Sequence, residues 1–194
     1  IDDFIKGEKL SPSILNFICK TVREVEEEPV NEENISQDIY NKGINQARGH
    51  AGYMLVQCAY FEDFKNNIFD TLEFIAETAS IYTRSAILLN MAILNIIDKD
   101  RNVSLFKKLL HDYNPSLMSM PVHNHNPLVY FVNYAVEEII DFLRHASDCP
   151  ECYKEQVILI WLAWSHNNHH AESRKLLDKM CDNSEEARLS LLEF

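Results

Sequence analysis

Cysteine and histidine side chains around residue 150 have the order and spacing of a metal site. Cys149 and Cys152 are followed by His166 and His170, and this order matches a Cys2His2 zinc site, whose ligands all lie about 2.0 to 2.3 Å from one ion. Residues 153–165 contain no turn signal. If they form one helix, Cys152 and His166 are about 21 Å apart at roughly 1.5 Å per residue. The spacing therefore argues against a shared zinc ion.

A second histidine pair lies in a loop bounded by prolines. His123 and His125 are one residue apart, between Pro121 and Pro127. Two imidazoles at that spacing could share a metal ion, but no carboxylate or thiol stands beside them to complete a ligand set. We therefore interpret both histidines as surface loop residues.

His111 and Asp112 form a His-Asp dipeptide of the kind found in metal-dependent phosphohydrolases. Such enzymes also need an upstream histidine and a downstream aspartate that converge on the same metal ions. His50 and Asp141 are present in that order. Short motifs of this kind occur often by chance. A metal-dependent helical (HD-like) hydrolase built on these four residues is the alternative hypothesis.

Other catalytic signatures are missing from the sequence. The phosphate-binding motifs G-x-x-x-x-G-K-[ST] and G-x-G-x-x-G do not occur, nor does the nucleophile motif G-x-S-x-G. The 4 glycines and 6 prolines are fewer than a β-sandwich or a phosphate-cradling fold uses at its turns. The leading prediction is therefore a protein that is not an enzyme and has no catalytic, cofactor-binding or metal residues.

Composition narrows the classes of partner and compartment. The chain has 194 residues, 46% of them hydrophobic, and a formal net charge of −12. The acidic balance disfavours nucleic acid as a partner. Five cysteines, an odd number, suit a reducing cytosol better than a disulfide framework. No signal peptide or membrane-spanning apolar run is recognisable, so we expect a cytoplasmic protein.

Apolar residues recur at helical spacing along almost the whole chain, and no strand pattern is recognisable. We predict an all-α fold of antiparallel helical hairpins, stacked as a short HEAT/TPR-like α-solenoid. Residues 1–194 form a single helical-repeat domain in this prediction, and the start at Ile1 suggests a fragment of a larger protein. The predicted helices cover residues 11–22, 40–59, 63–79, 80–96, 103–110, 131–143, 151–166, 171–180 and 184–194.

Three segments of this prediction have a distinct character. The helix over 80–96 is apolar on almost every side and should lie at the centre of the fold. The acidic stretch at about 26–38 is predicted to be a solvated loop, with an acidic docking site as the alternative. An irregular, proline-marked connection is predicted at about 113–127.

Arginines near helix starts suggest an internal repeat. Arg48 and Arg84 are 36 residues apart, each near the start of an apolar helix, and Arg188 begins a third. In HEAT-type units such an arginine reaches carboxylates or carbonyls of the neighbouring unit and joins the stack. An ordinary exposed arginine is the alternative for each position.

The same region carries a family resemblance. Residues 43–51, of sequence GINQARGHA, resemble the small-Arg-Gly-x-Ala helix start in the C-terminal helical arrays of STAND-type NTPases, which include bacterial Avs antiphage proteins. Similar features follow in order at residues 82–86, 94–100, 130–134 and 147–148. The resemblance covers the chain from about residue 12 to its end.

The resemblance implies a role in recognition. In that family an effector and an ATPase precede the helical array. The array recognises a foreign protein, such as a viral packaging component, and triggers oligomerisation. This chain would be part of such a sensor and carry no catalysis itself.

We therefore expect a protein partner, no nucleic acid and no membrane, with oligomerisation possible through the parent protein. A purely architectural spacer is a third hypothesis, distinguished by the lack of an exposed apolar or aromatic patch. Trp161 and Trp164 are interpreted as packing residues, and their exposure would instead mark a binding face.

Overall fold

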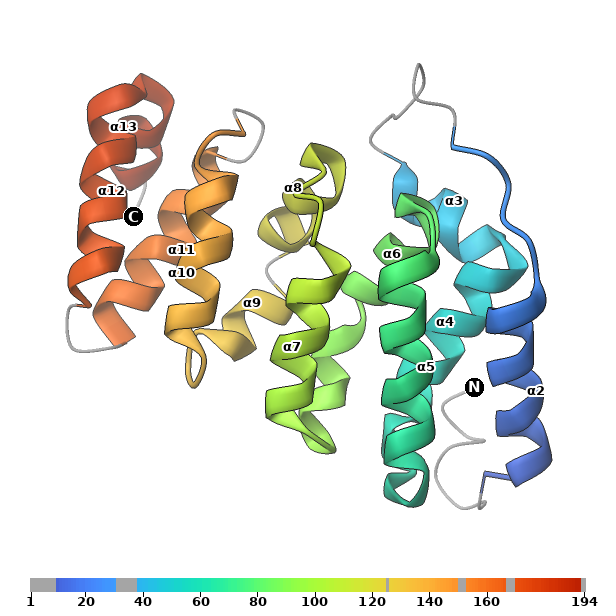
Figure 1. The fold of residues 1–194 in the computed structure, drawn as a ribbon. Coiled ribbons are helices and arrows are strands. Elements are labelled where there is room, and N and C mark those ends of the chain that lie inside the picture. Colours follow the sequence, from blue (N-terminus) through green and yellow to red (C-terminus); the bar gives the residue numbers. More distant parts are fainter. Residues whose placement is uncertain (1–9, 31–37, 125, 150–152, 167–169, 193–194) are drawn as a thin grey trace. The chain divides into compact units, whose positions relative to one another are not determined.

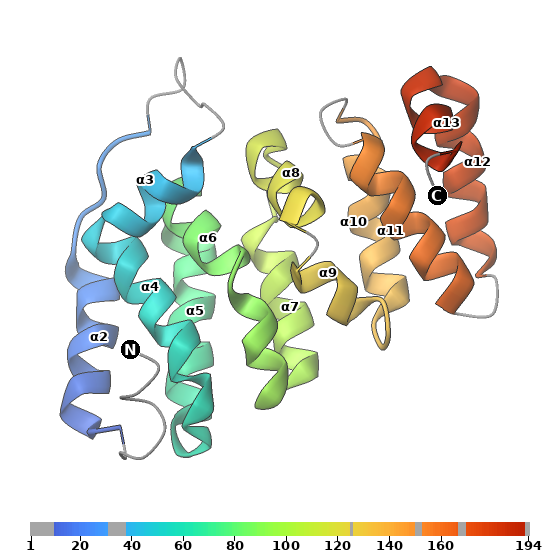
Figure 2. The same cartoon turned by 180° about the vertical axis from the view of Figure 1, so that it is seen from behind.

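The computed structural model describes residues 10–30, 38–124, 126–149, 153–166 and 170–192 (Figures 1 and 2). Every regular element in these residues is a helix, which confirms the all-α prediction. None of the helices in the described ranges is long and apolar enough to cross a membrane. The chain divides into two compact units, Ile1–His111 and Asp112–Phe194.

In the first unit, α2 packs on α4 and α5, α3 packs on α4 and α6, and α5 packs on α7. Buried aliphatic and aromatic side chains fill the space between these helices. The elements of this unit are α2 (Pro12–Glu24), α3 (Ile39–Asn45), α4 (Ala47–Gln57), η2 (Cys58–Tyr60), η3 (Glu62–Phe64), α5 (Lys65–Thr78), α6 (Ile81–Leu88), η4 (Met91–Ile96) and α7 (Lys99–Leu109).

In the second unit, α11 packs on α10, α12 and α13, and α8 contacts α9, α10 and α11. The elements are α8 (Pro115–Asn124), α9 (Asn126–Phe131), α10 (Val136–Ala146), α11 (Tyr153–His166), α12 (Ala171–Asn183) and α13 (Glu185–Leu192).

The helix predicted over 80–96 is central, but it is shorter than expected. All eight residues of α6 are buried. The helix ends at Leu88, and η4 follows as a 3₁₀ turn. Asn102, fully buried in α7, donates from Nδ2 to the Met91 carbonyl at 3.0 Å and to Asn95 Oδ1 at 2.9 Å. The Met91 carbonyl thus accepts its hydrogen bond from a side chain of another helix.

The helix predicted over 40–59 is broken at Gln46, whose backbone is extended (φ −86°, ψ 143°). At this break α3 and α4 approach each other through two glycines. A Cβ on Gly49 would overlap the carbonyl oxygen of Gly43, so only glycine permits this contact. The break is therefore set by close backbone packing, which the apolar spacing does not reveal.

The irregular connection predicted at about 113–127 is instead largely helical. Tyr113 has a left-handed backbone (φ 49°). Asn114 then caps α8, because its Oδ1 accepts from the backbone N–H of Ser116 at 3.1 Å. Pro115 follows as the first residue of the helix, a position that proline favours. The predicted helix over 131–143 begins only at Val136, after α9 and a turn.

Asp98 caps α7, and this cap gives a pH-dependent prediction. Its Oδ1 accepts from the Arg101 N–H at 2.9 Å, and Lys65 Nζ lies 2.7 Å from Oδ2. The hydrogen bond from Arg101, with that from Lys65, lowers the pKa of Asp98 below its usual value of 3.8.

Because that pKa is depressed in the folded state, the cap stabilises the protein above about pH 4 and is lost as pH falls through the folded pKa. We expect Asp98→Ala to lower the free energy of unfolding by about 1 kcal/mol at pH 7. In urea unfolding, the loss should shrink as the pH is lowered from about 4 through the folded pKa of Asp98. Asp100→Ala, in the same first turn, is the control and should change stability less. Equal losses for both variants would contradict the cap.

Candidate recognition pocket

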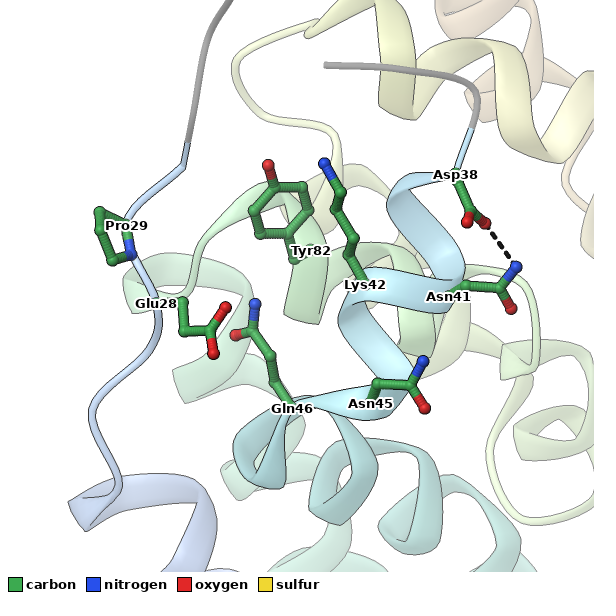
Figure 3. Close-up of a pocket in the computed structure, with 8 residues that line it drawn as sticks. All are labelled: Glu28, Pro29, Asp38, Asn41, Lys42, Asn45, Gln46 and Tyr82. Carbon is green, nitrogen blue, oxygen red and sulfur yellow. Dashed lines mark hydrogen bonds between the residues drawn. The ribbon is translucent and has the colours of Figure 1, made fainter. Parts of the chain in front are cut away.

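The first unit contains a polar pocket of about 370 Å³. Figure 3 shows its walls: the chain after α2 on one side, α3 on the other, and α6 behind them. Such a volume is at the lower end of the range for ligand pockets and suits one long side chain. The residues that line it are Glu28, Pro29, Asp38, Asn41, Lys42, Asn45, Gln46 and Tyr82.

Glu27 fixes the wall that carries Glu28. Its Oε2 accepts from the backbone N–H of Ser80 at 2.6 Å and lies 3.7 Å from Nη1 of Arg48. The Glu27 side chain is only 10% exposed. The carboxylate stands at the N-terminus of α6, where the helix dipole favours a negative charge. Here the prediction of a solvated acidic run is wrong for Glu27, whose partners lie far away in sequence. Residues 31–37 of that predicted loop lie outside the described residues.

Arg48 completes this buried network. Its Nε donates to the Val22 carbonyl at 2.8 Å, and its Nη2 donates to Thr78 Oγ1 at 2.8 Å. The guanidinium carbon lies 5.8 Å from the ring centre of Phe74. Of the two interpretations of this arginine, the contact with a carboxylate or carbonyl of another segment is present, and the exposed arginine is not.

Arg84 and Arg188 make the same kind of contact. Arg84 is buried in α6, and its Nη1 donates to the Leu109 carbonyl at 2.9 Å. Arg188 Nη1 donates to the Cys181 carbonyl at 2.9 Å. The accepting carbonyls belong to the last turns of α7 and α12, where backbone acceptors lack partners within their own helix. A cation at a helix C-terminus also complements the helix dipole.

From the hydrogen bond between Arg84 and the Leu109 carbonyl we predict a loss of stability when Arg84 is replaced. We expect Arg84→Met to lower the free energy of unfolding by about 2 kcal/mol, because the Leu109 carbonyl loses a charged donor. Arg188→Met, at an exposed contact, is the matched control and should cost about 0.5 kcal/mol or less. Urea unfolding of both variants measures the difference. Similar losses would indicate that burial of the contact is unimportant.

Tyr82 forms the back of the pocket and is itself buried. Lys42 Nζ lies 5.5 Å from the centre of its ring, and Figure 3 shows the two side chains next to each other. Gly43 presses against the Tyr82 carbonyl, which also accepts from Ser85 Oγ at 2.6 Å. These contacts hold α3 tightly on α6.

The rest of the described lining is polar and holds two carboxylates and three side-chain amides. In Figure 3 the end groups of Glu28 and Gln46 point toward one another. Gln46 Oε1 is buried and has no hydrogen-bond partner among the residues that the structure describes. Asp38 accepts a hydrogen bond from Asn41 Nδ2. Among the described lining residues, two carboxylates and one ammonium give a formal charge of −1.

The Cys-His pattern around residue 150 is divided between elements. Cys149 is buried after α10, Cys152 lies outside the described residues, and α11 is a single helix that ends at His166. His170 caps α12: its Nδ1 lies 3.3 Å from the Ser173 backbone nitrogen, and its Nε2 lies 2.6 Å from Glu137 Oε1. The structure thus confirms the single helix predicted over residues 153–165, between Cys152 and His166.

The residues of the hydrolase hypothesis lie in different units. His50 is exposed on α4, and His111 follows α7 with its Nδ1 2.9 Å from the Lys108 carbonyl. Asp112 and Asp141 belong to the second unit. The side chain of His123 and all of His125 fall outside what is described. Among the residues that are described, no three histidine, cysteine, aspartate or glutamate side chains come together to hold a metal ion.

Sequence reasoning identified Arg48 but missed Glu27, Gln46 and Tyr82. No local pattern joins them, because they come from three separate segments.

In comparisons with protein-family models, curated proteins and solved structures, the chain matches none.

Proposed function

We propose that this chain is a non-catalytic protein-recognition segment of a larger cytoplasmic protein. The observation that carries the proposal is the polar pocket of Figure 3. Its lining side chains stand on helices and on a loop that a buried ion pair fixes in place. A rigid scaffold that presents polar side chains in a hollow is suited to binding a partner's side chain.

The three arginine contacts support an array of HEAT- or TPR-like hairpins. Arg48, Arg84 and Arg188 each stand near a helix start and donate to a carbonyl in the last turn of another helix. An arginine-to-carbonyl contact that recurs near successive helix starts is typical of repeat proteins.

Exposed aromatic side chains favour a binding protein over a spacer. Tyr130 is 52% exposed, Tyr134 37% and Trp161 38%. Exposed tyrosine and tryptophan are enriched where proteins bind one another.

With the resemblance at residues 43–51, these features support a sensor of the kind found in STAND-type NTPases. The partner would bind one arrangement of the helices more tightly and so shift the population toward an active assembly. The relationship is tested by the reading frame upstream of Ile1. An in-frame Walker A motif with ATPase elements supports it, and a start codon directly before Ile1 removes it.

Recognition itself is tested by site-specific photocrosslinking in the native host. A photoreactive amino acid replaces Asn45 at the pocket rim or, as the control, Lys175, which is 71% exposed in the second unit. We expect one protein adduct from position 45 that is missing from position 175. After identification, the purified partner should bind the chain saturably. No adduct at position 45, or adducts to nucleic acid alone, would contradict the proposal.

The hydrolase alternative is tested by metal analysis. We expect purified protein to hold no stoichiometric transition metal. One metal ion per chain, lost in Asp112→Ala, would favour the enzyme.

A further inference from the structure

We propose that the pocket of Figure 3 binds an arginine side chain of the partner protein, with the guanidinium between Glu28 and Gln46. This inference rests on the proposed function, since it names the chemistry of the group that is recognised.

The charge of the lining and one buried acceptor favour a cationic donor. The described lining residues contribute the carboxylates of Glu28 and Asp38 and the ammonium of Lys42. The chain as a whole carries a formal charge of −12, which attracts basic segments. No donor within the described part of the chain reaches the buried Gln46 Oε1, and an unpaired buried acceptor costs free energy until a donor binds it.

The arrangement of acceptors selects guanidinium over ammonium. A carboxylate accepts two parallel N–H groups from one guanidinium, and the remaining N–H groups point to the sides of that fork. In Figure 3 the Glu28 carboxylate faces the Gln46 amide. One guanidinium can therefore bind Glu28 with two hydrogen bonds and reach Gln46 with a third. A lysine ammonium is a point charge and lacks this geometry.

The wall of the pocket is preorganised. Glu28 follows Glu27, which is bound by Ser80 and paired with Arg48. The opposite wall is held by α3, pressed against α6 at Gly43. Binding therefore requires little ordering of the main chain, and this favours affinity.

The test is an NMR titration of the full chain with three pentapeptides that differ only at the central residue: arginine, lysine, or citrulline, the uncharged isostere of arginine. We expect the arginine peptide to shift the signals of Glu28, Asn45 and Gln46. The lysine peptide should bind about tenfold more weakly, and the citrulline peptide should cause no saturable shift.

Glu28→Gln should weaken arginine-peptide binding about tenfold. Glu26→Gln removes the same charge two residues away, at an exposed position outside the lining, and should change binding less than twofold. Equal weakening by both variants would show diffuse attraction and overturn the proposal. So would equal binding of lysine and arginine peptides, or agmatine alone binding as tightly as the arginine peptide.

The two proposals fail separately. A crosslinked partner at position 45 combined with no arginine-peptide binding leaves protein recognition standing and removes the arginine pocket. A missing crosslink with intact arginine-peptide binding removes protein recognition, and with it the partner's arginine, and leaves only a pocket with affinity for guanidinium.

Discussion

Arg48→Met is expected to lower the free energy of unfolding by about 3 to 5 kcal/mol, because it leaves the Glu27 carboxylate buried without its cation. Both side chains are nearly enclosed, at 11% and 10% exposure. The Val22 carbonyl and Thr78 Oγ1 lose donors at the same time. A total stability of about 5 to 15 kcal/mol is usual for a folded protein, so urea unfolding should show a large shift in midpoint.

A double variant separates the ion pair from general damage. Arg48→Met with Glu27→Gln removes both charges but keeps an acceptor for the Ser80 N–H. We expect the double variant to be more stable than the sum of the two single losses predicts, by about 2 kcal/mol. Lys20→Met breaks the exposed pair with Glu24 and should change stability by about 0.5 kcal/mol or less. A loss for Arg48→Met no larger than that of Lys20→Met would contradict a stabilising role for the buried network.

The helices themselves could be predicted because their apolar spacing is a local signal. Burial of α6 followed from its nearly continuous apolar sequence. The places of Arg48 and Arg84 near helix starts allowed their contacts to be predicted as one of two alternatives. The cap at Asn114 and Pro115 was also visible locally, and giving it more weight would have predicted α8.

The breaks and the pocket depend on contacts between distant segments. Apolar spacing continues across Gln46 and Asn90, yet the helices stop there. Just after the second break, Asn102 donates a hydrogen bond to the Met91 carbonyl from another helix. The burial of Glu27 depends on Arg48 and Ser80, which no spacing rule connects to it. Long-range packing thus overrides the local pattern.

Gly43→Ala is expected to destabilise the protein although alanine is the better helix former. In an open helix the exchange would gain up to about 1 kcal/mol. Here the added Cβ would overlap the carbonyl oxygen of Tyr82. Backbone atoms cannot move aside as a flexible side chain can, so α3 must shift away from α6. We expect a net loss of about 2 to 3 kcal/mol in urea unfolding.

Gly52→Ala is the matched control, because its Cβ would meet only side-chain atoms, Ile87 Cδ1 at 3.2 Å and Ile75 Cδ1 at 3.3 Å. These groups can turn slightly, and the change should stay within about 1 kcal/mol. Because α3 and Tyr82 form two sides of the pocket, Gly43→Ala should also weaken arginine-peptide binding, whereas Gly52→Ala should not. If Gly43→Ala were as stable as Gly52→Ala, α3 could not be pressed onto α6 in solution, and the preorganised pocket would lose its main physical support.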